Sequence, residues 1–131
     1  MHNSTSPLAQ VVHFFYYSKQ MRKRDESLGS VEHIVLLAVM RLGKEAYGIT
    51  VLREIESIAG RNLSIGTVYA TLWRLESKGF VKTFAGEPTA ERGGRAKQYF
   101  RVTADGKSAV IKAQESILKM SSGLKDLLVG K

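Results

Sequence analysis

The chain has 131 residues, which is enough for one domain with a modest core, and at this size burial against a partner is a reasonable expectation. It carries 20 Lys and Arg against 12 Asp and Glu, and a formal net charge of +8 favours polyanions such as nucleic acid or anionic lipid. The absence of cysteine excludes disulfides and thiolate metal sites. Because the longest apolar clusters are far below the roughly 20 residues of a membrane span, we expect a cytoplasmic protein without stable membrane association.

An N-terminal extension, residues 1–27, opens with a polar stretch and continues as LAQVVHFFYYSKQ, which contains Phe14, Phe15, Tyr16 and Tyr17. The aromatic segment favours a short helix or strand that packs on the body or on a partner subunit. A membrane-surface anchor followed by basic residues 22–24 is an alternative, and so is a true start at Met21. The sequence leaves these alternatives open.

Three helices are predicted next, and they form a compact bundle. Apolar residues recur every three or four positions over Ser30–Leu42, with Ser30 as the cap, and then from Tyr47 or Gly48 to Ala59. In the second helix, the residues expected to face inward are Ile49, Leu52, Ile55 and Ile58. The third helix begins after Asn62 or Ser64, buries Val68, Leu72 and Leu75, and ends at Lys78 and Gly79.

From Phe80 the spacing of apolar residues changes to alternation, which predicts a β-hairpin with strands near residues 80–84 and 97–102. We expect Tyr99 to fix the second strand on the bundle, with Gln98 and Phe100 pointing outward. Thr103 then caps a last helix from about Ala104 to Leu128. Its apolar residues follow a heptad seam that is suited to a partner's helix, and the candidate dimerisation residues are Val110, Ala113, Ile117, Met120, Leu124 and Leu127.

The order of helix, helix, helix and hairpin indicates a mainly α fold with a small β-hairpin, the winged helix-turn-helix, in residues 28–103, followed by a dimerisation helix in residues 104–131. Residues 61–101 carry eight Lys and Arg against three Asp and Glu, so most of the net positive charge lies in the third helix and the hairpin. The polar face of the third helix comprises Ser64, Thr67, Tyr69, Ala70, Thr71, Trp73, Arg74 and Lys78. Small hydroxyl residues at a helix N-terminus suit close approach to phosphates and base edges.

Plainer roles stay open for several of these residues. Ser64 and Thr67 can serve mainly as helix caps, and Tyr69 can be a half-packed core residue with its hydroxyl at the surface. Trp73 is expected to pack against the hairpin or an adjacent helix. A solvated hairpin without a DNA contact is the corresponding alternative for ERGGRAKQYF, residues 91–100, where Gly93 and Gly94 allow a tight reversal of the chain.

Three stretches of the chain resemble the PadR family of transcriptional regulators in its short form. They are LGSVEHIVLLAVMRLGKEAYGITVLREIE, SIGTVYATLWRLESKGFVKT and GEPTAERGGRAKQYFRVTADGKSAV, which together cover Leu28 to about Ala113. The resemblance implies a dimeric winged-helix repressor, usually of a neighbouring transport or stress-response operon, that a small molecule or other signal releases. The candidate DNA-binding residues are Ser64, Thr67, Tyr69, Ala70, Arg74, Arg92, Arg95 and Lys97.

An enzyme is not expected, and no cofactor, metal or catalytic residue is assigned. The three histidines, His2, His13 and His33, have no spacing typical of metal ligands, and GEPTAERGG lacks the features of a phosphate-binding loop. The expected partners are a near-palindromic double-stranded DNA operator, a second copy of the chain and a small-molecule effector of unknown identity. The alternative function is a winged-helix module for protein interaction or non-specific nucleic-acid binding.

Overall fold

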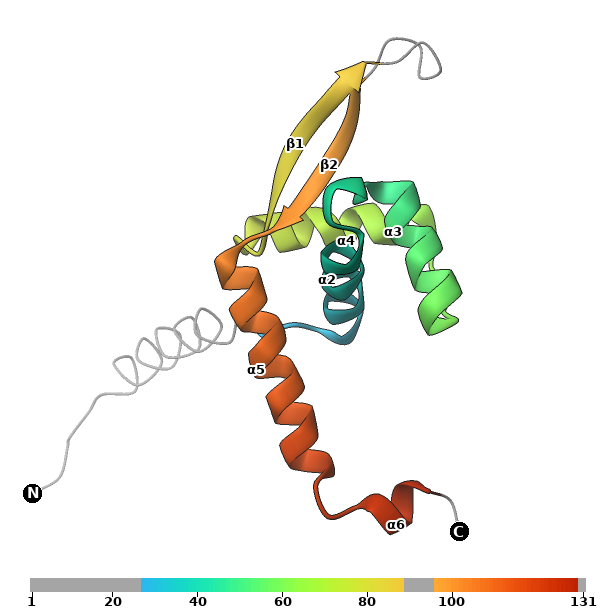
Figure 1. The fold of residues 1–131 in the computed structure, drawn as a ribbon, viewed down its shortest axis with the longest axis vertical. Coiled ribbons are helices and arrows are strands. Elements are labelled where there is room, and N and C mark those ends of the chain that lie inside the picture. The colour runs from blue at the N-terminus through green and yellow to red at the C-terminus, as the bar shows by residue number, and fades with distance from the viewer. Residues whose placement is uncertain (1–26, 89–95, 130–131) are drawn as a thin grey trace, which may run out of the picture.

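The computed structural model describes residues 27–88 and 96–129 of the protein, and Figure 1 shows their arrangement. A bundle of three helices carries a hairpin at one end, and a long helix leaves the bundle in the opposite direction. The aromatic segment at residues 14–17 lies outside the described residues, so its predicted packing is untested. The elements, in chain order, are α2 (Ser30–Leu42), η1 (Gly43–Glu45), α3 (Gly48–Glu54), η2 (Ile55–Ala59), α4 (Ile65–Ser77), β1 (Val81–Pro88), β2 (Ala96–Val102), α5 (Ala104–Ser121) and α6 (Lys125–Leu128).

The central helix α2 packs against α3, α4, β2 and α5 and supplies much of the core. Its predicted range is confirmed, but the N-cap is Gly29 instead of Ser30. The side chain that caps the helix belongs to Glu32, whose Oε1 accepts a hydrogen bond of 2.8 Å from the backbone N–H of Gly29. Because α2 is covered on several sides, Leu36 is as fully buried as Val35 and Val39.

The predicted second helix is divided into α3 and the single π-helical turn η2. The side chains that enter the core are Val51, which was not predicted, and Ile55, whereas Ile58 is 60 % exposed and its predicted inward position is wrong. A π-turn holds more residues than an α-turn, so it rotates the following side chains away from the face that α3 buries. The element ends at Ala59, as predicted, and Gly60 follows it in a left-handed conformation that glycine adopts without strain.

Helix α4 confirms the predicted cap and the predicted buried stripe. Ser64 accepts a hydrogen bond of 3.0 Å from the N–H of Thr67, and Val68, Leu72 and Leu75 are fully buried. The prediction that Thr71 lies on the polar face is wrong, because this position falls between the three apolar residues on the helix surface. Its hydroxyl is satisfied by donating to the carbonyl oxygen of Thr67 at 2.7 Å.

The two strands form the predicted antiparallel hairpin, with a regular register from Val81↔Val102 to Ala85↔Gln98. The prediction for the second strand is wrong at Phe100, which is fully buried and packs edge-on against Trp73 with 5.5 Å between ring centroids. Phe100 also donates its N–H to the carbonyl oxygen of Ala46, and Tyr47 forms an isolated antiparallel bridge with Tyr99 beside the two-stranded sheet. Since side chains alternate along a strand, Tyr99 faces the other way.

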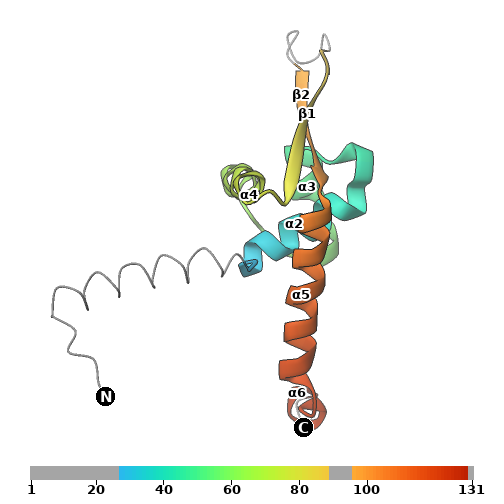
Figure 2. The ribbon, with the colours of Figure 1, turned by 90° about the vertical axis from the view of Figure 1, so that its left-hand side faces the viewer.

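The C-terminal helix α5 begins as predicted, with Thr103 accepting a hydrogen bond of 3.0 Å from the N–H of Gly106. The predicted continuous helix to Leu128 is wrong, because α5 ends at Ser121 and the four-residue α6 follows. Between them Ser122 is extended and Gly123 has φ 82°, a left-handed conformation that glycine adopts without strain. Beyond its first two turns, α5 projects from the body of the protein (Figures 1 and 2).

Candidate nucleic-acid interface

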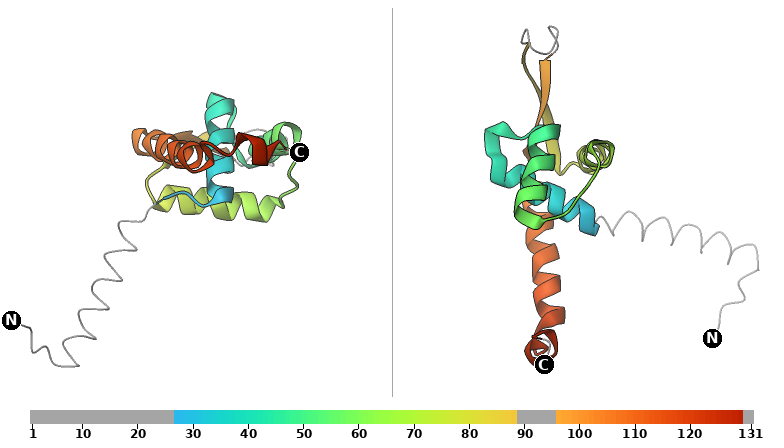
Figure 3. Two further views of the ribbon diagram at one scale, coloured as in Figure 1. Left: turned by 90° about the horizontal axis from the view of Figure 1, so that it is seen from below. Right: turned by 90° about the vertical axis from the view of Figure 1, so that its right-hand side faces the viewer.

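Helix α4 lies across the bundle below the hairpin, with one side turned away from the other helices (Figures 1 and 3). Four of the predicted DNA-binding residues are exposed on this helix or at its cap, and they are Ser64, Thr67, Ala70 and Arg74. The structure therefore brings these four together. Of the predicted hairpin residues, Lys97 is described, whereas Arg92 and Arg95 lie outside the described residues.

The N-terminus of α4 can approach another molecule closely. Ser64 and Thr67 bond to each other, with 2.9 Å between their hydroxyl oxygens, and both remain exposed. Capping and contact with a ligand are thus compatible roles for them. Gly66 between them was missed as a candidate: a Cβ built on it meets only Ser64 Oγ, at 3.9 Å, so its surroundings are open. The backbone N–H groups of a first helical turn without side-chain cover suit phosphate oxygens.

Tyr69 is half-buried and connects α4 to the start of α3. Its ring covers Gly48 so closely that a Cβ on Gly48 would lie 2.7 Å from Tyr69 Cε2 and closer still to the end of the ring. Glycine at position 48 thus allows the two helices to meet through this tyrosine. The packing confirms a half-buried Tyr69, and it fixes the ring while Thr67, Ala70 and Arg74 stay exposed.

Lys97 is held against the body of the protein by Tyr47, which is not among the predicted site residues. The ammonium nitrogen lies 4.3 Å from the centroid of the Tyr47 ring and donates to the Tyr47 hydroxyl at 3.2 Å. Tyr99 packs edge-on against the same ring, with 5.3 Å between centroids. These contacts attach the hairpin to the loop before α3, and the only sequence signal for them is that Tyr47 falls within the first stretch that resembles the PadR family.

A buried carboxylate, Glu32, lies next to the C-terminal half of α4. Its Oε1 is 2.9 Å from Lys78 Nζ, and its Oε2 is 3.6 Å from Arg74 Nε. Burial opposes ionisation of Glu32, but the hydrogen bonds from Lys78 and Gly29 and the charges of Lys78 and Arg74 outweigh it, so its pKa lies below the ordinary value. Glu32 is therefore ionised and engages both cations of α4.

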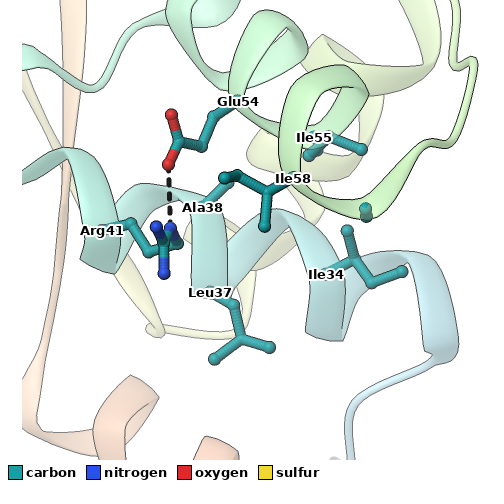
Figure 4. A pocket seen from close by; sticks show the side chains of 8 residues that line it. Ile34, Leu37, Ala38, Arg41, Glu54, Ile55 and Ile58 are labelled. Carbon is teal, nitrogen blue, oxygen red and sulfur yellow. Dashed lines mark hydrogen bonds and ion pairs between the residues drawn. The ribbon is translucent and has the colours of Figure 1, made fainter.

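An apolar groove of about 270 Å³ lies apart from this surface, between α2 and η2 (Figure 4). Ile34, Leu37 and Ile58 line it, and the Arg41–Glu54 ion pair, at 2.8 Å, forms part of its rim. The sequence predicted no such groove, since the groove depends on the π-turn that exposes Ile58.

Elsewhere on α2, His33 Nε2 is buried without a hydrogen-bond partner among the described residues.

The predicted dimerisation residues divide into two groups along α5 and α6. Val110 is 4 % exposed and packs in the core of its own chain, and Ala113 is half-buried. The others are exposed, with Ile117 at 65 % and Met120 at 78 %. The same part of the chain exposes several apolar residues that were not predicted, namely Ile111, Leu118, Leu128 and Val129.

None of the helices in the described part of the chain is long and apolar enough to cross a membrane.

Residues 36–112 match the family model for the transcriptional regulator PadR-like family. A PadR family transcriptional regulator from Eggerthella lenta is similar in structure, with a TM-score of 0.60 and 20% identity over 94% of this chain and 100% of the other. A PadR-like transcriptional regulator from Bacillus cereus has a TM-score of 0.62 and 18% identity, over 77% of this chain and 93% of the other. A transcriptional regulator from Clostridium thermocellum has a TM-score of 0.61 and 22% identity, over 73% of this chain and 90% of the other. No curated protein matches the chain. With more than half of its length matched, the chain belongs to the PadR-like family of transcriptional regulators, which act by binding DNA, and it has their winged-helix fold.

Proposed function

We propose that the protein is a homodimeric, sequence-specific repressor that binds a near-palindromic operator through α4. The observation that carries the proposal is the exposed face of α4, where Ser64, Thr67, Ala70 and Arg74 combine hydroxyl groups, a small side chain and a cation. A helix of this kind fits the major groove, where hydroxyl groups and arginine contact base edges and phosphates.

The hairpin adds a second DNA-binding element to the proposal. Lys97, together with Arg92 and Arg95, which lie between the two strands in the sequence, supplies positive charge that would contact phosphates or the minor groove. Such contacts contribute affinity for any DNA more than they contribute sequence choice. The contacts of Lys97 and Tyr99 with Tyr47 hold the hairpin against the segment before α3, and the packing of Phe100 on Trp73 holds it beside α4, which supports this role.

Dimerisation through the projecting part of α5 and through α6 completes the proposal. Ile117 and Met120 on the projecting part of α5 and Leu127 on α6 are each more than half exposed, and they would be buried by a second copy. A two-fold dimer places two α4 helices one helical turn of DNA or more apart, so its operator is an inverted repeat. A small molecule or other signal would release the protein by favouring a different separation of the two halves.

Selection of bound duplexes from a random DNA library at about 0.15 M salt tests this function. We expect enrichment of an inverted repeat with half-sites roughly 10 base pairs or more apart. Arg74→Ala should abolish the enrichment. Lys112→Ala, which removes an exposed positive charge from the polar side of α5, should preserve it. Retention of DNA without enrichment of any sequence would instead support a non-specific nucleic-acid-binding module.

A further inference from the structure

Glu32 joins two helices at the edge of the proposed DNA-binding surface. Its side chain is 9 % exposed, whereas the side chains of the two cations it engages, Lys78 and Arg74, are 25 % and 51 % exposed. Glu32 Oε1 forms an ion pair with Lys78 and accepts a hydrogen bond from the N–H of Gly29, whereas Oε2 forms an ion pair with Arg74. A single acidic residue of α2 therefore engages Arg74 in the last turn of α4 and Lys78, the C-cap residue that follows it.

The two cations are held to different degrees. Lys78 donates to Glu32 at 2.9 Å and to the carbonyl oxygen of Ser27 at 3.2 Å, so its ammonium group is fixed at two points. Arg74 lies at the longer distance of 3.6 Å and is half exposed, so its guanidinium can still contact another group. The geometry thus engages the ammonium group of Lys78 within the protein and leaves the guanidinium of Arg74 accessible.

We propose that Glu32 is a positioning residue that raises the sequence specificity of DNA binding, because it keeps Lys78 from phosphates and orients Arg74. The inference rests on the proposed function of α4. A lysine on a DNA-facing helix binds phosphates of any sequence, which strengthens non-specific binding without helping to choose an operator. Because the carboxylate of Glu32 binds the ammonium group of Lys78, this lysine adds less to the affinity for random DNA. Sequence choice then depends on the residues that precede Lys78 on the exposed face of α4.

The variant Glu32→Gln tests the proposal, because glutamine keeps the shape of the side chain and an oxygen that can accept the N–H of Gly29 but loses the charge. Binding to a random duplex is measured by fluorescence anisotropy over a range of salt concentrations. One additional phosphate contact makes the fall of log K with log[salt], where K is the association constant for DNA, steeper by about 0.9. It also tightens binding about five- to tenfold at ~0.1 M salt. We expect this change for Glu32→Gln, together with a smaller ratio of operator to random affinity.

Two further variants separate this role from a purely structural one. Glu32→Gln combined with Lys78→Met should return the slope to the wild-type value, since the released lysine is then absent. Lys78→Met alone should leave the wild-type slope unchanged; a slope shallower by about 0.9 would show that Lys78 already contacts phosphate and would overturn the proposal. That variant retains Glu32 and so gives a result even if Glu32→Gln fails to fold.

The outcomes distinguish this inference from the proposed function. A wild-type protein that binds no DNA would refute the proposed function itself. A wild-type protein that binds DNA, with Glu32→Gln folded and showing the same slope and the same specificity ratio, would refute only the role of Glu32. A lower Tm of Glu32→Gln with no change in slope would likewise assign Glu32 a purely structural role.

Discussion

The substitution Gly106→Ala should destabilise the protein, although the residue lies in a helix where alanine is the better helix former. A Cβ at position 106 would overlap the carbonyl oxygen of Phe80 and lie 2.8 Å from Val102 Cγ2. That carbonyl oxygen also accepts the N–H of Thr103 at 3.0 Å, so the overlap disturbs the junction of the hairpin and α5.

The magnitude follows from the two opposing effects. Helix propensity favours alanine over glycine by up to about 1 kcal/mol. Overpacking of a core costs about 1–3 kcal/mol, and the atom met here belongs to the backbone, which cannot rotate away as a side chain can. The weakened hydrogen bond adds about 1 kcal/mol. We expect a net loss of about 2 kcal/mol, which lowers the Tm by roughly 10 °C.

Thermal unfolding followed by circular dichroism measures this effect, with all variants at one protein concentration because the Tm of a dimer depends on concentration. Gly66→Ala is the matched control, since Gly66 is also helical but a Cβ there meets no atom closer than 3.9 Å. It should keep or slightly raise the Tm. A Gly106→Ala variant as stable as the wild type would refute the close approach of α5 to Phe80.

Four other predictions concern the core, a cap, the buried carboxylate and the dimer. Phe100→Ala should cost about 3–5 kcal/mol in urea unfolding because the side chain is fully buried. Ser64→Ala should cost about 1 kcal/mol in the same assay, since it removes the acceptor of the Thr67 N–H. The pKa of Glu32 is lower in the folded protein than in the unfolded chain, so the stability that ionised Glu32 adds to the fold is complete above about pH 4.5 and is lost as the pH falls through the folded-state pKa. The difference in unfolding free energy between the wild type and Glu32→Gln, measured by urea titration, should therefore shrink at lower pH. Ile117→Asp should raise the dimer dissociation constant in sedimentation equilibrium.

The sequence predicts the elements whose signals are local. The helix caps at Ser64 and Thr103 are confirmed because each hydroxyl reaches a backbone N–H only three residues away. The buried residues of α4 are confirmed at Val68, Leu72 and Leu75 because one side of this helix faces the bundle and the other does not.

The remaining features depend on contacts between distant parts of the chain. Alternation along β2 gives two faces but does not say which one meets α4, so Phe100 was assigned to the wrong side. The contacts of Glu32 with Lys78 and of Tyr47 with Lys97 span 46 and 50 residues. No local pattern predicts such pairs, although the exposed cap of α4 that forms the candidate site could be predicted.

The comparison of operator and random DNA tests the central claim most directly. The selected duplex, a duplex with one half-site scrambled and a random duplex are titrated with the wild-type protein at about 0.15 M salt, and the number of chains bound is measured at saturation. We predict two chains on the selected duplex and an affinity for it at least about 10³-fold above that for random DNA, with the scrambled half-site in between. Equal affinity for the three duplexes, or a single chain bound to the selected one, would contradict the account.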